Sequence, residues 1–204
     1  KVLEADLLKP IAEEIAQKAD VLLIGYAGGG VRNVFANKPL RSLAEMKGVK
    51  LRVMGAPVWS RAFAAVGMSP SVIAYNEVYN AIQNGVISAG DNEAAGIEQM
   101  KFYEVASHVS MTQHSYTIRP LCFSGKTFKT LPPALQAAIL KAGKEAGAYG
   151  RDLESREDVA KLEAMEKTGK LKRVPFPDRE RMQKLVEPVL DVYARDIGAE
   201  QILA

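Results

Sequence analysis

Cysteine and histidine are scarce in this sequence, and their scarcity excludes several kinds of site. The 204 residues include one cysteine and two histidines. Because Cys122 has no second cysteine, no internal disulfide can form, and its apolar surroundings "RPLCFSG" predict a small buried core residue. His108 and His114 cannot complete a zinc pattern with a single cysteine. We therefore expect neither a metal ion nor a cofactor.

The sequence also lacks long apolar runs and a dominant charge. No stretch approaches the roughly 20 apolar residues that a membrane-spanning helix needs. The 27 basic and 24 acidic residues are mixed along the chain and leave a formal net charge of +3. Because no basic stripe is present, nucleic acid is not an expected partner. No leader opens the sequence, so we expect an export signal to have been removed or to lie outside it.

Catalytic motifs are missing as well. The segment "SGKT" at 124–127 resembles part of a phosphate loop, but position 120, where that loop needs glycine, is a proline. The segment "GYAGGG" at 25–30 follows an apolar run, yet Pro39 comes too soon for a dinucleotide-binding helix, so we interpret 27–42 as a loop crossing between lobes. No serine lies in a G-x-S-x-G elbow. We therefore predict no catalytic residues and no enzyme.

Short strands and helices alternate between residues 49 and 105, and this order predicts an α/β layer with mostly parallel strands. Glycines within the long helical pattern after residue 131 predict a bend or break near 147–151. The predicted helices cover 10–20, 42–48, 57–67, 76–85, 93–105, 132–168 and 177–198, and the predicted strands cover 21–26, 48–54, 71–74, 86–88, 109–118, 119–125 and 171–176.

Polar side chains lie where several predicted strands meet a loop or helix. In "GVKLRVMGAP", Arg52 alternates with the apolar Leu51 and Val53, so it faces away from them. Arg32, Tyr75 and Asn92 occupy comparable positions. Because the carboxyl ends of strands line the ligand crevice of an open α/β sheet, these four residues are the candidates for binding.

Three segments together resemble the solute-binding proteins of TRAP transporters, the DctP type of periplasmic substrate-binding subunit. They are "NKPLRSLAEMKGVKLRV", "VYNAIQNGVI" and "KFYEV", in this order and at these spacings. The resemblance extends over nearly all of the chain and includes the long helix after "KTFKTLPPALQAAILKAG". Each segment alone would be a weak signal.

The resemblance implies a two-lobe α/β fold, like that of type II periplasmic binding proteins, with a long bent helix bridging the lobes. Residues 1–29 and 118–157 would form part of the first lobe with the bridging helix. Residues 30–117 and 158–204 would form the second lobe. On the order of 100 further residues of the first lobe would precede this chain, so its N-terminal part is absent here.

The resemblance also implies a function and roles for the candidate residues. Such proteins hold an organic acid between the lobes in the periplasm and deliver it to the membrane permease subunits of the transporter. Arg52 matches the main carboxylate-binding arginine and Arg32 a second arginine on the ligand side. Asn92 matches an asparagine of the site and Tyr75 an aromatic residue. Sugar acids and C4-dicarboxylates are both possible ligands, and we favour a sugar acid or a related hydroxy acid because Asn92 and Tyr75 add polar groups. We also expect a monomer when the chain is complete.

The chain departs from the family pattern at Ser88–Asn92, which lacks the usual aspartate, glycine and glutamate. Two other functions remain open on the residues alone. One is the effector-sensing domain of a LysR-like transcription regulator, which has a related two-lobe fold. The other is a small α/β enzyme, which would turn over its ligand rather than only bind it.

Overall fold

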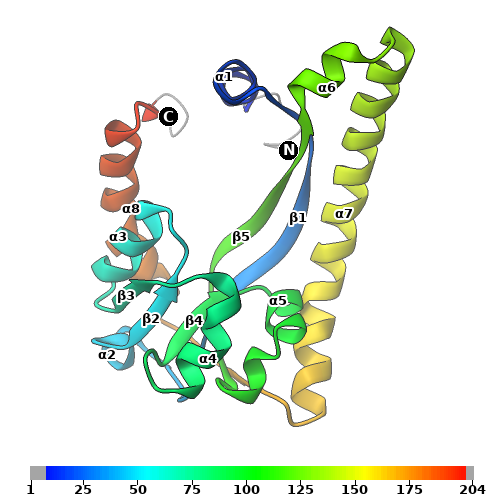
Figure 1. The fold of residues 1–204 in the computed structure, drawn as a ribbon. Coiled ribbons are helices and arrows are strands. Elements are labelled where there is room, and N and C mark those ends of the chain that lie inside the picture. Colours follow the sequence, from blue (N-terminus) through cyan, green and yellow to red (C-terminus); the bar gives the residue numbers. More distant parts are fainter. Residues whose placement is uncertain (1–7, 201–204) are drawn as a thin grey trace. The chain divides into compact units, whose positions relative to one another are not determined.

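The structure of the chain, a computed structural model, describes residues 8–200 (Figure 1). The helices are α1 Lys9–Ala19, α2 Leu43–Met46, α3 Pro57–Ala65, α4 Val78–Gln83, α5 Ala94–Gln99, α6 Gly125–Thr130, α7 Pro133–Lys167 and α8 Arg179–Asp196, with the 3-10 turns η2 Tyr75–Glu77 and η3 Phe102–Glu104. The strands are β1 Val21–Ala36, β2 Lys50–Val53, β3 Ser69–Val72, β4 Ala89–Asn92, β5 His108–Ser124 and β6 Lys172–Val174. Within residues 8–200, no helix has the length and apolar character needed to cross a membrane.

The chain divides into two compact units, each built from two segments. Unit 1 comprises Lys1–Gly30 and Tyr116–Glu157, and unit 2 comprises Val31–Ser115 and Asp158–Ala204. The elements β1, β5 and α7 therefore contribute residues to both units. That these units are the two lobes of a binding protein remains a prediction.

The strands form one mixed sheet in the order β3-β2-β4-β1-β5-β6. Strand β2 pairs in parallel with β3 and β4, and β5 pairs in parallel with β6. Strand β1 pairs antiparallel with β4, which places Asn33 opposite Asn92. The parallel order predicted for the short strand–helix repeats is confirmed for β3, β2 and β4.

Two hydrophobic clusters cover the two faces of the sheet in unit 2. Val34 and Ala36 of β1 belong to one cluster and Phe35, between them, belongs to the other, as the alternation of a strand requires. Helices α2, α3 and α8 supply side chains to the first cluster, and α4, α5 and the end of α7 supply the second. Unit 2 is therefore a helix–sheet–helix sandwich, the α/β class that the sequence predicted.

Local sequence signals account for several helix ends. The Ser42 side chain accepts a hydrogen bond from the backbone N–H of Glu45, so Ser42 caps α2. Helix α3 begins at Pro57, where a missing N–H costs nothing, and Gly67 follows its end with a φ of 86°. The helix predicted to begin at Asn76 begins two residues later, because Asn76 lies inside the turn η2 and α4 starts at Val78 without a side-chain cap.

The glycine-rich loop predicted at 27–42 is wrong for 27–36, because β1 continues through the glycines to Ala36, and is confirmed for 37–42, which contain neither helix nor strand. Gly28 and Gly29 have φ values of 107° and 120°, which other residues adopt at a cost. A Cβ at Gly28 would lie 2.1 Å from the carbonyl oxygen of Thr117. The glycines therefore permit close approach of neighbouring chain rather than a loop.

Helix α7 also differs from the prediction, since it runs from Pro133 to Lys167 with no break at 147–151. Its glycines serve packing within unit 1. A Cβ on Gly143 would lie 2.6 Å from the carbonyl oxygen of Ile24, and one on Gly147 would lie 2.8 Å from the backbone nitrogen of Tyr26. Glycine allows the helix backbone to approach β1 directly.

Three further predictions are corrected. The strand predicted at 86–88 lies at Ala89–Asn92 instead, where a loop was expected. The two extended segments predicted at 109–118 and 119–125 form the single strand β5. Cys122, predicted to be buried, is exposed. The alternating exposure along the end of β5 explains the last error, because only every second side chain is covered.

Candidate functional site

The four predicted binding residues come together in unit 2. Arg52 and Asn92 lie at the ends of their strands, as expected, but the strand end expected at Arg32 is wrong, because Arg32 lies inside the long strand β1. Arg32 lies on β1, Arg52 on β2, Asn92 ends β4 and Tyr75 begins η2. Direct contacts connect all four in the order Arg32, Asn92, Tyr75 and Arg52. The four residues predicted from the sequence therefore form one connected cluster.

Arg52 presents the least engaged cation of this cluster. Its side chain faces away from Leu51 and Val53, which lie in the core, as predicted. The Nε–H donates to the backbone oxygen of Ile73 at 2.9 Å, and the guanidinium carbon lies 5.5 Å from the centre of the Tyr75 ring. Burial lowers the pKa of Arg52, yet a guanidinium stays charged at neutral pH.

The outer nitrogens of Arg52 are the open part of its side chain. Within residues 8–200, Nη1 and Nη2 of Arg52 donate no hydrogen bond, and neither atom is both buried and unpartnered. The fixed Nε and the underlying Tyr75 ring hold the guanidinium plane in place. An immobilised fork of N–H donors is suited to a planar carboxylate.

Arg32 is engaged almost completely within the protein. Its Nε–H donates to Oδ2 of Asp91 at 2.7 Å, and its Nη1 donates to Asn92 at 2.9 Å and to Glu93 at 3.1 Å. Its Nη2 donates to the backbone oxygen of Asp91 at 2.7 Å. These bonds use four of the five N–H groups of a guanidinium, and two carboxylates balance its charge.

Asn92 and Tyr75 link the two arginines. The amide nitrogen of Asn92 donates to the Tyr75 hydroxyl at 2.9 Å, while the amide oxygen accepts from Arg32. Burial raises the pKa of Tyr75, so its hydroxyl keeps a proton to donate. Asn92 packs against the first turn of α5, where a Cβ on Gly96 would lie 2.3 Å from the amide nitrogen.

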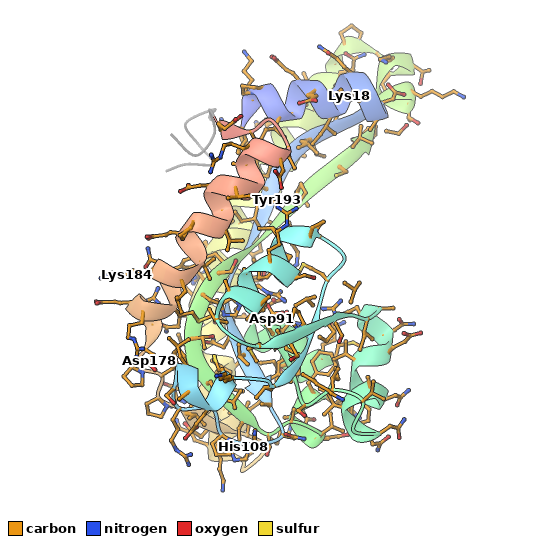
Figure 2. All side chains as sticks on the ribbon, turned by 90° about the vertical axis from the view of Figure 1, so that its left-hand side faces the viewer. Lys18, Asp91, His108, Asp178, Lys184 and Tyr193 are labelled. Atoms are coloured by element: carbon orange, nitrogen blue, oxygen red, sulfur yellow. The ribbon has the colours of Figure 1, made fainter. Side chains whose placement is uncertain are left out.

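Asp91 forms the buried centre of the cluster, inside unit 2 in Figure 2. Burial alone would raise the pKa of Asp91, but the hydrogen bond from His114 and the charge of Arg32 hold it below its ordinary value. The Nε2 of His114 lies 3.4 Å from Oδ2 of Asp91, and its Nδ1 lies 2.8 Å from the hydroxyl of Thr112. Asp91 is therefore an ionised structural partner of Arg32.

A neighbouring pocket of about 490 Å³ lies between α3, β5 and α8. Trp59 and His114 line it, and both touch the cluster, because the Arg32 guanidinium lies 5.6 Å from the Trp59 ring and His114 faces Asp91. None of the four predicted binding residues lines this pocket. Within the described part of the chain, no group of three or more metal-ligating side chains is arranged to hold an ion.

Sequence reasoning missed the residues that hold the site rather than form its surface. Asp91 and Glu93 pair with Arg32, and His114 and Trp59 pack beside them. The sequence does contain a signal for Asp91, because the segment Ser88–Asn92 departs from the family pattern and still supplies a carboxylate. Trp59 is the sole tryptophan of the sequence, but nothing local indicated its neighbours.

The cluster as a whole is rich in hydrogen-bond donors. Arg52 offers its outer N–H groups, Tyr75 its hydroxyl proton, and Asn92 a second amide hydrogen beside the one given to Tyr75. The carboxylates of Asp91 and Glu93 are turned to Arg32. Such an arrangement can hold an anionic, oxygen-rich molecule.

Known proteins resemble this chain along nearly all of its length. Residues 1–196 match the sequence model of a family described as bacterial extracellular solute-binding protein, family 7, also called DctP. The chain belongs to this family. A solute-binding protein of Sulfitobacter sp. (strain NAS-14.1) is 52% identical over 202 residues, which are 99% of this chain and 61% of that protein. The chain thus spans about three fifths of the length of this relative.

Two crystal structures of family members extend the comparison. A TRAP periplasmic solute-binding protein from Sulfitobacter sp. NAS-14.1, with bound α-D-taluronate, has a TM-score of 0.96 at 52% identity. The match covers 99% of this chain and 66% of that protein. Another structure, of a protein from Roseobacter denitrificans with bound β-D-glucuronate, has a TM-score of 0.85 at 28% identity, and the match covers 95% of this chain and 65% of that protein. The expected family and α/β fold are confirmed, and the LysR-like alternative loses its basis.

Proposed function

We propose that this family 7 chain is part of a periplasmic TRAP solute-binding protein that captures a sugar acid and delivers it to the membrane permease. The protein would bind its ligand without turning it over. Family membership and the uronates held by the two related structures support this proposal. In this account, unit 2 is the second lobe and unit 1 is part of the first.

The observation that carries the proposal is the contrast between Arg52 and Arg32. Arg52 is held by Ile73 and Tyr75 with its outer N–H groups open, whereas two carboxylates balance the charge of Arg32. Of the two arginines in this cluster, Arg52 is therefore the one whose outer N–H groups are open to a ligand. A single carboxylate fits this site, and the second carboxylate of a C4-dicarboxylate would find no free cation here.

The remaining donors suit the hydroxyl and ring oxygens of a sugar. Asn92 and Tyr75 can each donate one hydrogen bond, and Arg32 has one Nη2 hydrogen left. A charged hydrogen bond contributes about 1.5–3 kcal/mol net, whereas micromolar to nanomolar binding needs about 8–12 kcal/mol. Arg52 therefore selects an acid and orients it, and these donors and released water supply the rest.

A thermal-shift screen of the full-length protein tests this function. The ligand set pairs uronates and aldonates with a C4-dicarboxylate, an aldarate and the neutral parent sugars. We expect the largest melting shift from a sugar acid with one carboxylate, because a ligand stabilises the state that binds it. A largest shift from succinate or from a neutral sugar would contradict the proposal, and consumption of the acid would indicate an enzyme.

A further inference from the structure

The binding cluster depends on β1 and on the end of β4, and one buried carboxylate on another element connects β1 with the start of α5, the helix that follows β4. Asp158 of α7 is 5% exposed. Its Oδ2 accepts from the backbone N–H of Val31 at 3.2 Å, and its Oδ1 accepts from the backbone N–H of Ala94 at 3.0 Å. Asp158 thus joins backbone positions that lie 63 residues apart, since 94 − 31 = 63.

Both N–H groups lie next to the site. Val31 precedes Arg32 directly, and Ala94 follows Glu93, whose carboxylate accepts from Arg32. Val31 and Asp158 are also the residues at which β1 and α7 enter unit 2. The first bond therefore fixes β1 where the strand turns its arginine toward β4.

The second bond fixes the start of α5. Ala94 is the first residue of this helix. An N–H group at the start of a helix has no partner within the helix, and a carboxylate is favourable there. The helix packs Gly96 against the Asn92 amide, so its position sets the room available to that side chain. One carboxylate thereby constrains the backbone on both sides of the contact between Arg32 and Asn92.

We propose that Asp158 is a positioning residue for the ligand site, which sets the placement of Arg32 and Asn92 without touching the ligand. The expected effect of Asp158 on ligand affinity rests on the proposed function. The effect of Asp158 on the placement of Arg32 is independent of any ligand. Trp59 reports that effect, because the Arg32 guanidinium lies 5.6 Å from the centre of its ring.

The test is Asp158→Asn in the full-length protein. The amide keeps the size of the side chain but places an N–H₂ group against one of the two backbone N–H donors. We expect the fluorescence of Trp59 in the ligand-free folded protein to change, with a Trp59→Phe variant identifying its contribution. We also expect affinity for D-glucuronate, by calorimetry well below the melting transition, to fall about tenfold, which is about 1.4 kcal/mol.

Asp152→Asn is the matched control, because Asp152 lies on the same helix with its side chain 63% exposed and pairs with Arg156. It should leave Trp59 fluorescence and affinity unchanged. Should Asp158→Asn not fold, Asp158→Ser replaces it, since a hydroxyl keeps one acceptor oxygen with less steric demand.

The outcomes separate the two proposals. A lower melting temperature with unchanged Trp59 fluorescence and unchanged affinity overturns the positioning role and leaves Asp158 as a structural residue only. Changed affinity with unchanged fluorescence also overturns it, because Arg32 is bonded directly to Asn92 and the contact between these two residues would then not have moved. If the wild-type protein binds no sugar acid, the proposed function fails, and the fluorescence comparison still decides the role of Asp158.

Discussion

Gly96→Ala should damage the site by displacing one side chain. Gly96 lies in α5, and a Cβ there would be 2.3 Å from the amide nitrogen of Asn92 and 2.6 Å from its Cγ. Because these distances are far shorter than van der Waals contact, Asn92 must move. Its hydrogen bonds to Tyr75 and Arg32, both 2.9 Å long, would then be lost or weakened.

The expected change in the free energy of unfolding follows from those two hydrogen bonds. The neutral bond to Tyr75 is worth about 0.5–1.5 kcal/mol and the charged bond from Arg32 about 1.5–3 kcal/mol. Alanine in place of glycine in a helix returns up to about 1 kcal/mol. The net loss should be about 1–3 kcal/mol in the free energy of unfolding, and sugar-acid affinity should fall because Asn92 no longer faces the ligand.

Urea unfolding of a double-mutant cycle with Asn92→Ala measures this effect. When Asn92 is already truncated, no clash remains, so Gly96→Ala should be neutral or stabilising by up to about 1 kcal/mol. The cycle should give a coupling energy of at least about 1 kcal/mol. Equal effects of Gly96→Ala in both backgrounds would refute the argument.

Three further changes test separate parts of the account. Arg52→Lys should weaken sugar-acid binding at least about tenfold by calorimetry, because an ammonium lacks the planar fork, and unchanged affinity would contradict this. Gly143→Ala should lower the free energy of unfolding by about 1–2 kcal/mol despite better helix propensity, because its Cβ would strike the β1 backbone; a higher urea midpoint would contradict this. The pKa of Asp91 is lower in the folded protein than its ordinary value of 3.8, so the ionised carboxylate stabilises the fold above pH 3.8, and this stabilisation is lost as the pH falls through the lowered pKa. Asp91→Asn should therefore lower the urea midpoint near neutral pH and make the midpoint depend less on pH in acid. A pH profile of the urea midpoint that runs parallel to that of the wild type would count against this.

The sequence predicted the residues proposed to face the ligand better than the residues that hold them in position. Arg52 could be found because strand alternation and the position at a strand end are local properties, and the structure places it away from Leu51 and Val53. Asp158 gave no such signal. Its partners, Val31 and Ala94, are 127 and 64 residues away in sequence, and backbone N–H groups carry no residue identity.

Glycine caused the main errors in the fold. Local rules treat glycine as a breaker, and so 27–42 was predicted as a loop and α7 as interrupted. In the structure Gly143 lies against Ile24 of β1, and its small size permits that close approach. Whether glycine ends an element or permits close packing depends on a partner far away in sequence, which a single sequence does not reveal.

The central claim is that Arg52 recognises the single carboxylate of a sugar acid. Calorimetric titration of the full-length protein with D-glucuronate and with D-glucose, in the wild type and in Arg52→Ala, tests it most directly. We predict that the wild type prefers the acid and that Arg52→Ala loses at least about tenfold of this preference, about 1.4 kcal/mol, with little change for glucose. An equal preference for the acid in both proteins would contradict the claim.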